Sequence, residues 1–544
     1  MKKSFVSVIA TTLVLSSFVV GCSSSKSNSS DKAGGTSTSS PEASQTTTYP
    51  IKTDKKLSYW ATLQGNIVGV KSSLDEVPFF QEWPKKTGVP LVYTTAANNA
   101  SDRQFNVMLA SGDLPDMIEY NWTNGYPGGP EKAIKDGYIL KLNDLIDKYA
   151  PNLKKYLKEH PEVDKMVKTD NGSYYVFPFI RGDNYLQVYH GPIVRKDWLD
   201  ELGLPVPTTI DEWYTTLKAF KDKKGAAAPI ALVGQPNPLN DTATGDFVGA
   251  FGVTKGFYLD NGKIKFGPME QGFKDFLATF RKWYTEGLID KNMATTDVKA
   301  IDANFANGST GATVGNAGGG IGRWQPIVEA KYPKAVLVGT PYPTLKKGDM
   351  PQFGQLDVPF TPAGSVAISA KSKNAELAVK MLDYGYSEEG RMFFNFGTEN
   401  TSYKMDNGYP RYTDLVMKNP DKLAVAQAMS LYTRGNYTGP FIQDKRYAEQ
   451  FFALQTQRDA VTVWQKTDMA KHQLPPITPT PEESSEFAKI MNDTNTLVNE
   501  MILKIILGAE PVDSFDKFVE KMKSMKIDRA LEIQQAALDR YNKR

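Results

Sequence analysis

Apolar residues recur along most of the chain with two alternating periods. Six short runs, rich in β-branched and aromatic residues, predict strands over 57–60, 89–94, 116–120, 174–179, 335–340 and 365–370. Between these runs the apolar spacing is near 3.6 residues, which predicts amphipathic helices over 269–286, 374–384 and 514–526. The alternation indicates an α/β protein with parallel sheets covered by helices on both faces.

The first apolar run, at residues 5–20, differs from all the others. It follows two lysines, and it is too short and too rich in Ser and Thr to span a membrane. The run ends in Val-Val-Gly-Cys at 19–22, which resembles a bacterial lipobox. We therefore interpret residues 1–21 as a lipoprotein signal peptide and expect a diacylglyceryl group on Cys22, because two acyl chains anchor a protein stably. The alternative is an ordinary secretory signal with an incidental cysteine.

Residues 22–51 contain mostly Ser, Thr, Gly, Asn and Lys. So few apolar side chains cannot bury enough surface to offset the entropy of ordering, so we expect a disordered tether. No later window is apolar enough to cross a membrane. The folded body is therefore expected outside the cytoplasm, held at the membrane by the lipid on Cys22.

The composition argues against several kinds of partner and site. Lys and Arg number 64 and Asp and Glu 61, so the near-neutral balance gives no reason to expect nucleic acid. A single cysteine excludes intrachain disulfides and Cys-based metal clusters. The three histidines, His160, His190 and His472, lie far apart and in no metal-binding spacing. We expect neither a cofactor nor a metal.

A series of short motifs then follows in a characteristic order. They include Pro-Phe-Phe-Gln-Glu-Trp at 78–83, Ala-Ser-Gly-Asp-Leu-Pro-Asp at 110–116, Arg-Lys-Asp-Trp-Leu at 195–199, Pro-Thr-Thr-Ile-Asp-Glu-Trp at 207–213, Gly-Arg-Trp at 322–324 and Ser-Lys-Asn-Ala-Glu-Leu-Ala at 372–378. In this order the motifs resemble the extracellular solute-binding proteins of family 1, the lipoprotein receptors of carbohydrate ABC importers. The long C-terminal region resembles the large oligosaccharide-binding members. The resemblance runs from about residue 55 to residue 544.

This resemblance implies a periplasmic-binding-protein-like fold, with two α/β lobes and a sugar in the cleft between them. The implied division is 52–182 plus about 365–400 for lobe 1, and 188–360 plus part of 401–544, with C-terminal helices, for lobe 2. The chain would cross between the lobes near 183–187 and 361–365. General physics agrees, because ligands bind outside the carboxyl ends of parallel strands.

A sugar site needs aromatic platforms for C–H faces and planar polar groups for hydroxyls. Strand ends and loops expected at the cleft carry Trp60, Gln64, Asn66, Tyr120, Trp122, Asn184, Asp241, Arg323, Trp324 and Asp357. By the resemblance, Tyr120 and Trp324 carry over best as stacking residues, and the Arg323 guanidinium suits vicinal hydroxyls or a uronate. Each aromatic could equally be buried packing, and each polar residue a cap or turn. Core positions are expected for Trp83, Trp198, Trp213 and Trp283.

Two tempting motifs indicate no site. The Gly-rich run at 315–320 lacks the Lys-Ser/Thr of a phosphate-binding loop and suits a close backbone turn at a helix start. Large members of the resembled family often carry an acidic calcium loop after the Pro-Thr-Thr helix. Here residues 221–228 hold one acid among three lysines, which cannot supply the oxygen ligands of calcium.

The resemblance implies a lipid-anchored substrate-binding protein, monomeric and not an enzyme. It would capture an oligosaccharide at the extracytoplasmic face and deliver it to the permease subunits of an ABC transporter. Two alternatives stay open. A secreted glycoside hydrolase would need two carboxylates about 5–10 Å apart. Asp and Glu are abundant, so the sequence does not exclude such a pair. A surface lipoprotein without a small ligand is the third possibility. The identity, length and charge of the sugar are not predicted.

Overall fold

The structure is a computed structural model that describes residues 46–544, apart from 69, 98–99, 235–238 and 240–244. The predicted signal peptide, Cys22 and most of the predicted tether lie outside these residues, and so does Asp241. Within them, no helix combines the length and the apolar character needed to cross a membrane.

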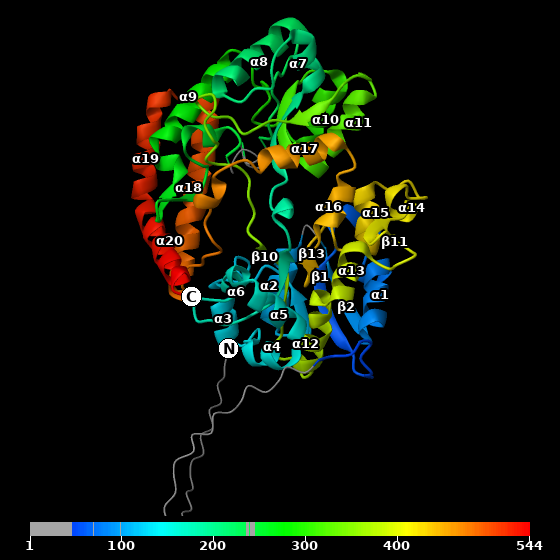
Figure 1. The fold of residues 1–544 in the computed structure, drawn as a ribbon. Helices are drawn as coiled ribbons and strands as arrows, with labels where there is room; N and C mark the ends of the chain where they lie inside the picture. The colour runs from blue at the N-terminus through cyan, green and yellow to red at the C-terminus, as the bar shows by residue number, and fades with distance from the viewer. Residues whose placement is uncertain (1–45, 69, 98–99, 235–238, 240–244) are drawn as a thin grey trace, which may run out of the picture. The chain divides into compact units, whose positions relative to one another are not determined.

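The first sheet has six strands in the order β13-β4-β10-β3-β1-β2 (Figure 1). The strands are β1 (Leu57–Thr62), β2 (Leu91–Ala96), β3 (Met117–Glu119), β4 (Phe177–Arg181), β10 (Phe360–Ile368) and β13 (Ile442–Gln443). β1 runs parallel to β2 and β3, and β13 runs parallel to β4. β10 is antiparallel to both β3 and β4, so the sheet is mixed rather than parallel as predicted.

The second sheet has three strands in the order β8-β5-β9, and every pairing is antiparallel. Its strands are β8 (Ala312–Asn316), β5 (His190–Arg195) and β9 (Leu337–Gly339). The prediction of a parallel sheet is therefore wrong here, because periodicity along one strand carries no information about the direction of its neighbour. β5 and β8 were not predicted at all: Pro192 and the glycines at 191 and 315 weaken the strand pattern.

Two hairpins complete the β-structure, β6 (Phe257–Asp260) with β7 (Lys263–Phe266) and β11 (Tyr403–Asp406) with β12 (Tyr409–Tyr412). Each turns through Asn-Gly, and Asn261 and Asn407 both have a positive φ, of 50° and 49°. Asn-Gly is favoured in such two-residue turns because both positions need a positive φ. Both hairpins therefore turn at the residues whose sequence favours it.

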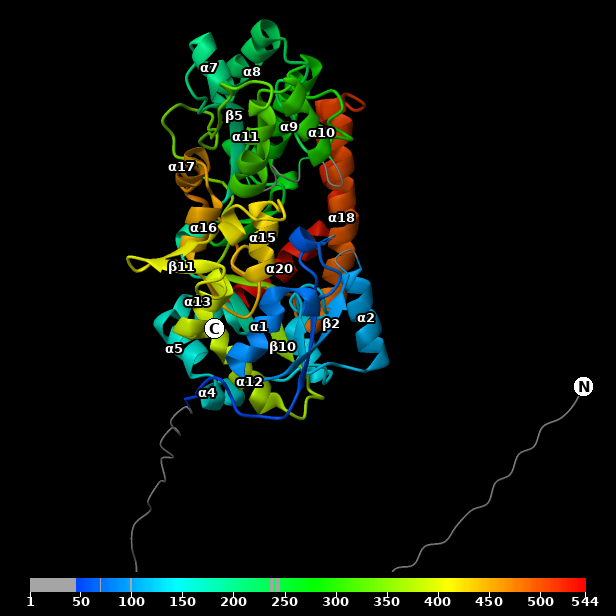
Figure 2. The ribbon, with the colours of Figure 1, turned by 90° about the vertical axis from the view of Figure 1, so that its right-hand side faces the viewer.

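Helices surround both sheets (Figures 1 and 2). Around the first sheet lie α1 (Pro78–Thr87), α2 (Ser101–Ser111), α3 (Gly129–Lys135), α4 (Asn143–Tyr149), α5 (Pro151–Glu159), α6 (Pro161–Val167), α12 (Ala375–Asp383), α13 (Glu388–Phe396), α14 (Asp414–Met417), α15 (Val425–Tyr432) and α16 (Lys445–Phe451). The others are α7 (Lys196–Leu202), α8 (Ile210–Lys224), α9 (Gln271–Thr285), α10 (Val298–Asn307), α11 (Gly322–Glu329), α17 (Gln455–Trp464), α18 (Pro481–Leu507), α19 (Phe515–Ser524) and α20 (Ile527–Asn542). The three helices predicted from apolar spacing correspond to α9, α12 and α19.

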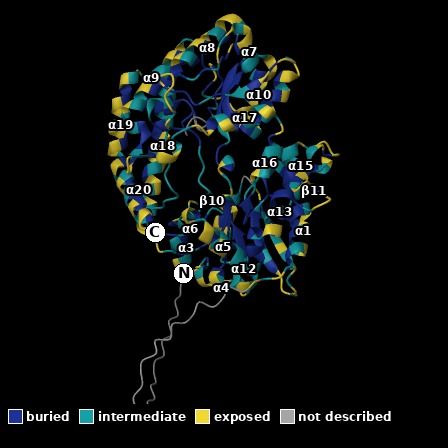
Figure 3. Ribbon diagram, in the orientation of Figure 1, coloured by how far each residue is buried: buried dark blue, intermediate teal, exposed yellow. Residues whose placement is uncertain are grey.

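Helix α18 shows how local sequence builds this layer. Thr480 accepts from the backbone N–H of Glu483 at 3.3 Å, and the Glu483 carboxylate accepts from the Thr480 N–H at 3.2 Å. This reciprocal pair satisfies two N–H groups that a helix start leaves unpaired. The helix then buries an apolar stripe in the same core as α9 (Figure 3). Trp83, Trp198, Trp213 and Trp283 are buried, as predicted.

Three segments connect the two sheets. Residues 182–189 join β4 to β5, residues 340–359 join β9 to β10, and α16 leads from β13 to α17, which packs on β9 through Gly339 and Ala460. The crossing expected at 361–365 lies inside β10, so this connection ends at Phe360. The proposed two-lobe division, with its boundaries, stays a prediction.

Candidate functional site

A cavity with a volume of about 330 Å³ lies beside β4, the 182–189 connection, the end of β8 and α16. Its lining is Phe179, Arg181, Tyr185, Leu186, Tyr189, Asn316, Gly318, Gly319, Asn436, Tyr437, Thr438, Gln443, Tyr447, Ala448, Phe451 and Phe452. Seven of these residues are aromatic, and most of the others carry an amide, a hydroxyl or a guanidinium. Rings with a few convergent polar groups are the usual lining of a small-molecule site.

The charged corner of the cavity is Arg181, at the end of β4. Its Nη2 lies 2.6 Å from Asp357 Oδ2, which also accepts from the Tyr189 hydroxyl at 3.2 Å. Gln355 donates to the other carboxylate oxygen at 3.1 Å. The Arg181 guanidinium also lies over the Tyr189 ring, 5.6 Å from its centroid. Among the described residues Arg181 is the one charged side chain of the lining, and Asp357 balances it.

Three buried polar atoms of this lining have no hydrogen-bond partner within the part of the chain that the structure describes. They are Arg181 Nε, Tyr185 Oη and Gln443 Oε1. Gln443 is only 2% exposed, and its Nε2 donates to the Gly435 carbonyl at 2.6 Å and to Tyr447 Oη at 3.1 Å. These bonds fix the amide and leave its oxygen unused. Buried polar atoms are nearly always paired, so three such atoms in one lining point to a hydroxyl-bearing ligand.

The cavity tyrosines are donors over the physiological range. Burial raises the pKa of Tyr185, Tyr189 and Tyr447 to about 12. Their ordinary pKa is near 10, and taking a phenolate out of water is costly. Each hydroxyl therefore keeps its proton at neutral pH and can both donate and accept a hydrogen bond.

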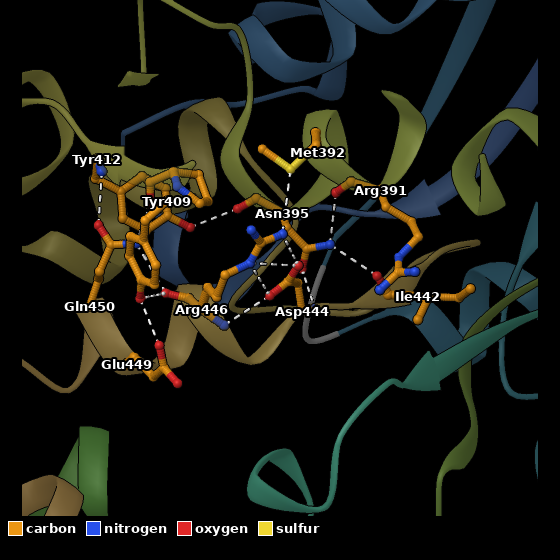
Figure 4. A network of polar contacts seen from close by, with 11 residues as sticks. Arg391, Met392, Asn395, Tyr409, Tyr412, Ile442, Asp444, Arg446, Glu449 and Gln450 are labelled. Atoms are coloured by element: carbon orange, nitrogen blue, oxygen red, sulfur yellow. Dashed lines mark hydrogen bonds and ion pairs between the residues drawn. The ribbon is translucent and has the colours of Figure 1, made fainter. Parts of the chain in front are cut away.

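Asn395 bonds the backbone of Ile442 and Asp444, the residues on either side of Gln443 (Figure 4). We call this arrangement the Asn395 bracket. The fully buried Asn395 donates from Nδ2 to the carbonyls of Ile442 at 2.9 Å and Arg391 at 2.8 Å. Its Oδ1 accepts from the backbone N–H of Asp444 at 2.8 Å. The amide thus bonds the backbone on both sides of Gln443, as a neighbouring strand would. On its other side β13 pairs with β4, so the orientation of Gln443 is fixed from two directions.

Asn436 is supported by a second polar chain. Its Nδ2 donates to the Ala426 carbonyl at 3.0 Å and to Ser430 Oγ at 3.2 Å. Ser430 Oγ also lies 3.4 Å from Nδ2 of Asn66, one of the residues predicted from sequence. Asn66 does not line the cavity and is connected to Asn436 through Ser430.

The predicted aromatics in β1 and after β3 pack on one another. The Tyr120 ring stacks on Phe105 at 3.8 Å between centroids, and its hydroxyl donates to Asp102 at 2.8 Å. Trp60 and Trp122 are buried in the same cluster. Tyr120 is half-buried, and no ring of this group lines the cavity.

Trp324 also belongs to a core, with 3% of its surface exposed. It packs against Phe305 and donates from Nε1 to Asp302 at 3.0 Å. The Gly-rich run makes room for it, because a Cβ at Gly315 would lie 2.6 Å from the ring. The run forms the end of β8 and a π-helical turn, Ala317–Ile321, that leads into α11, so the predicted close turn at a helix start is confirmed.

The remaining predicted residues are scattered. Gln64 is buried with both amide atoms unpaired among the described residues, and it does not line the cavity. Asn184 is exposed and accepts from Gln187 at 3.3 Å. Arg323 is exposed and pairs with Asp302. Asp357, which holds Arg181, is the predicted residue that touches the lining directly. The residues that line this candidate cavity were not predicted from the sequence, and the ligand contacts predicted for the other residues stay a prediction.

A sequence signal for the missed residues exists at 436–452. This stretch contains five aromatic residues, Tyr437, Phe441, Tyr447, Phe451 and Phe452, interspersed with Asn, Thr and Gln. It lies between helical patterns and has no clear period of its own. Aromatic rings interleaved with planar amides are the residue types that a sugar site needs. No group of three or more His, Cys, Asp or Glu placed for a metal ion occurs among the described residues.

A family model described as bacterial extracellular solute-binding protein matches residues 71–392, more than half of the chain. The chain is 29% identical over 269 residues to the fructooligosaccharide ABC transporter substrate-binding protein FusA of Streptococcus pneumoniae serotype 4. This match covers 45% of the chain and 46% of FusA, about half the length of that relative. Lipoprotein LipO of Bacillus subtilis is 24% identical over 382 residues, which cover 68% of the chain and 72% of LipO.

Among solved structures, the alginate-binding protein AlgQ2 without calcium ion has a TM-score of 0.72 and 29% sequence identity. That likeness covers 90% of this chain and 99% of AlgQ2. A solute-binding protein from Bifidobacterium longum infantis, described as binding HMO, has a TM-score of 0.73 at 18% identity, with the same coverage. The predicted periplasmic-binding-protein-like fold class is confirmed.

Proposed function

Because the chain belongs to the bacterial extracellular solute-binding proteins, we propose that it captures an oligosaccharide in the cavity beside Tyr437 and Gln443. It then delivers this ligand to the permease subunits of an ABC importer. The proposal goes beyond the family because it assigns the cavity residues and the chemical class of the ligand.

One observation carries this assignment: unpaired polar atoms and aromatic rings share a single lining. Tyr185 Oη and Gln443 Oε1 suit the hydroxyl rim of a sugar, since each can bond an O–H group. The rings of Tyr437 and Phe451 suit its apolar C–H faces. A purely apolar ligand would leave the polar atoms unpaired, which is unfavourable in a buried site.

We propose further that the sugar is neutral. The charge of Arg181 is already balanced by Asp357, 2.6 Å away. A uronate would bring a second carboxylate beside this pair, and a buried charge without its own partner is costly. The volume of about 330 Å³ lies at the small end for ligand sites, which favours a short oligosaccharide. The charge of the sugar also distinguishes the similar proteins, since FusA is named for fructooligosaccharides and AlgQ2 for alginate.

Calorimetry with two panels of short oligosaccharides tests the ligand class. One panel is neutral and contains fructooligosaccharides and raffinose-type sugars, and the other contains uronic-acid oligomers of equal length. We expect a neutral sugar to bind and the uronic panel to be at least tenfold weaker. Tight binding only of the acidic panel would refute the neutral ligand.

Product analysis on the same samples tests the alternative functions. We expect each bound sugar to be recovered intact after long incubation, since a receptor breaks no bond. Cleaved sugar would favour the secreted hydrolase. Binding of no sugar in either panel, judged also by an unchanged melting temperature, would favour a surface lipoprotein without a small ligand.

We also propose that Cys22 carries the lipid that holds the protein, as a monomer, at the extracytoplasmic face of the membrane. The Val-Val-Gly-Cys string at 19–22 supports this, and the relative LipO is named a lipoprotein. Cys22→Ser should abolish lipid attachment, because a hydroxyl does not replace the acceptor thiol. Metabolic labelling with a fatty acid followed by cell fractionation measures the result. Equal labelling of parent and variant would refute the anchor.

A further inference from the structure

Part of the cavity wall rests on a buried arginine that does not itself line the cavity. Arg434 follows α15 and is only 1% exposed. Its Nη2 lies 2.5 Å from Oε1 of Glu119, the last residue of β3. Oε2 of the same carboxylate accepts from the Tyr59 hydroxyl at 2.5 Å. A buried charge pair needs such additional hydrogen bonds to offset its desolvation, and here both carboxylate oxygens are used.

Other contacts of Arg434 reach two residues of the lining, Thr438 and Tyr437. Its Nε donates to the Thr438 carbonyl at 2.6 Å, and Nη2 donates to the same oxygen. Its guanidinium lies over the Tyr437 ring, 5.4 Å from the centroid, and over the Phe80 ring at the same distance. One side chain therefore holds the Thr438 backbone and the ring of Tyr437, and both residues line the cavity.

The opposite side of this wall is closed by a glycine. Gly364 lies in β10 at the point where the pairing with β4 shifts register, and its φ is 76°. A Cβ at this position would lie 2.0 Å from Thr438 Oγ1. Thr438 is thus confined between Gly364 and Arg434, which leaves the wall little freedom to move.

We propose that Arg434, oriented by Glu119, is the positioning residue for Tyr437 and Thr438, and that it sets ligand affinity without touching the ligand. The proposal rests on the proposed function of the cavity. A wall that is already ordered spares the ligand the cost of immobilising it on binding. Arginine suits this role because its planar fork bonds the carbonyl and the carboxylate together while its face stacks on a ring, which the lysine ammonium cannot do.

Arg434→Lys is the main test, because it keeps the positive charge and removes the fork. We expect the affinity for the best neutral sugar to fall at least tenfold. Asp383→Asn is the matched control for lost stability. The buried Asp383 carboxylate accepts from Asn152 and from the backbone N–H of Leu153 at the start of α5, and it does not line the cavity. We expect Asp383→Asn to lower the melting temperature and leave the affinity within twofold of the parent.

A second readout needs no ligand. A fluorotyrosine placed at position 437 reports the environment of that ring by ¹⁹F NMR. We expect one narrow line in the parent and in Asp383→Asn, and a broadened or split line in Arg434→Lys. Glu119→Gln should give a smaller change of the same kind, because it weakens the orientation of Arg434 while keeping the shape of the side chain. It also serves as the test variant if Arg434→Lys does not fold.

These outcomes separate the positioning role from a merely structural one. A variant at Arg434 or Glu119 that loses melting temperature like Asp383→Asn, while keeping both the affinity and the single ¹⁹F line, would overturn the proposal. If the parent binds no sugar, the proposed function fails. The ¹⁹F line then decides the positioning of Tyr437 alone: a split line supports it and an unchanged line overturns it.

Discussion

Two of the regions in which aromatic side chains gather differ in what their rings surround. Behind β1 and β3, the rings of Trp60, Phe105, Tyr120 and Trp122 fill the volume between them. Beside β4 and β13, the rings of the cavity surround about 330 Å³. We call these regions the β1–β3 cluster and the cavity. Their residue types are nearly the same, so residue type alone does not separate a core from a site.

The polar atoms distinguish the two regions. In the β1–β3 cluster the Tyr120 hydroxyl bonds Asp102, and Trp122 Nε1 lies 3.4 Å from the Ile118 carbonyl. In the cavity, Tyr185 Oη and Gln443 Oε1 have no protein partner among the described residues. A cluster whose polar atoms are satisfied internally has nothing left for a ligand. In this comparison the unpaired polar atoms separate the cavity from the cluster, whereas the rings do not.

The largest effect is expected in the β1–β3 cluster. Trp122→Ala should lower the free energy of unfolding by about 3–5 kcal/mol, because it leaves a large void in a packed core. Sugar affinity should stay unchanged, since Trp122 does not line the cavity. Denaturant titration and calorimetry measure the two quantities. A stable variant that no longer binds sugar would make the cluster part of the site after all.

The next effect concerns the cavity at alkaline pH. Tyr185, Tyr189 and Tyr447 have a pKa of about 12 when folded and near 10 when unfolded. Between these values the unfolded chain loses protons that the folded one keeps, so stability falls as pH rises from 10 to 12. Each phenol contributes less than about 1.4 kcal/mol per pH unit, because all three side chains are only half-buried and solvent screens them. Replacing all three by Phe should make this slope shallower.

Chemical denaturation at several pH values measures that slope, and sugar affinity in the parent should stay level between pH 7 and 10. An affinity that already declines between pH 7 and 9 would show that a cavity phenol ionises there. Burial would then not raise the pKa of that phenol above the value of an exposed tyrosine.

Tyr185→Phe isolates one unpaired hydroxyl. The unligated protein should be equally or slightly more stable, because a buried group without a protein partner is removed. Sugar binding should weaken by about 0.5–1.5 kcal/mol, the net value of one hydrogen bond. Tyr120→Phe is the matched control in the β1–β3 cluster, where the hydroxyl is already bonded, and it should change stability and not affinity. The reverse pattern would invert the assignment of the two regions.

The smallest effect is expected at Arg323, which sequence reasoning placed beside a stacking tryptophan. Its side chain is 47% exposed, and its ion pair with Asp302 lies at the surface. Arg323→Ala should cost no more than about 1 kcal/mol of stability, and sugar affinity should not change. A clear loss of affinity, measured by the same calorimetry, would return Arg323 and α11 to the ligand site.

Local patterns were predictable wherever a single element determines them. The apolar stripes of α9, α12 and α19 arise because each helix buries one face. The Asn-Gly turns arise because these two residues readily adopt the positive φ that the turn needs. Strand direction was not predictable, because it depends on a partner far along the chain: β10 pairs with β3 over a separation of more than 240 residues. The central strand of the second sheet, β5, contains Pro192 and was not predicted. Its extended conformation depends on pairing with β8 and β9, which lie far along the chain.

The cavity could not be predicted from the sequence for a related reason. Its walls come from Arg181, from Asn316 and from the stretch that includes Tyr437 and Gln443, segments more than 100 residues apart that meet only in the folded chain. Trp60, Trp122 and Trp324 lie in or just beside the ends of strands or helices, where both a core and a site are possible. Whether a ring at such a place is covered depends on residues like Phe105 and Phe305, which no local pattern connects to it.

The Asn395 bracket also bears on how the protein behaves in concentrated solution. β13 is one edge of the six-stranded sheet, and an open edge invites strands of other molecules to add and aggregate. The Asn395 amide already occupies the carbonyl of Ile442 and the N–H of Asp444, so that edge is blocked to incoming strands. The opposite edge is β2, where the Val92 side chain is 54% exposed. Self-association in storage should therefore begin at β2, and a lysine there is the natural place to improve solubility.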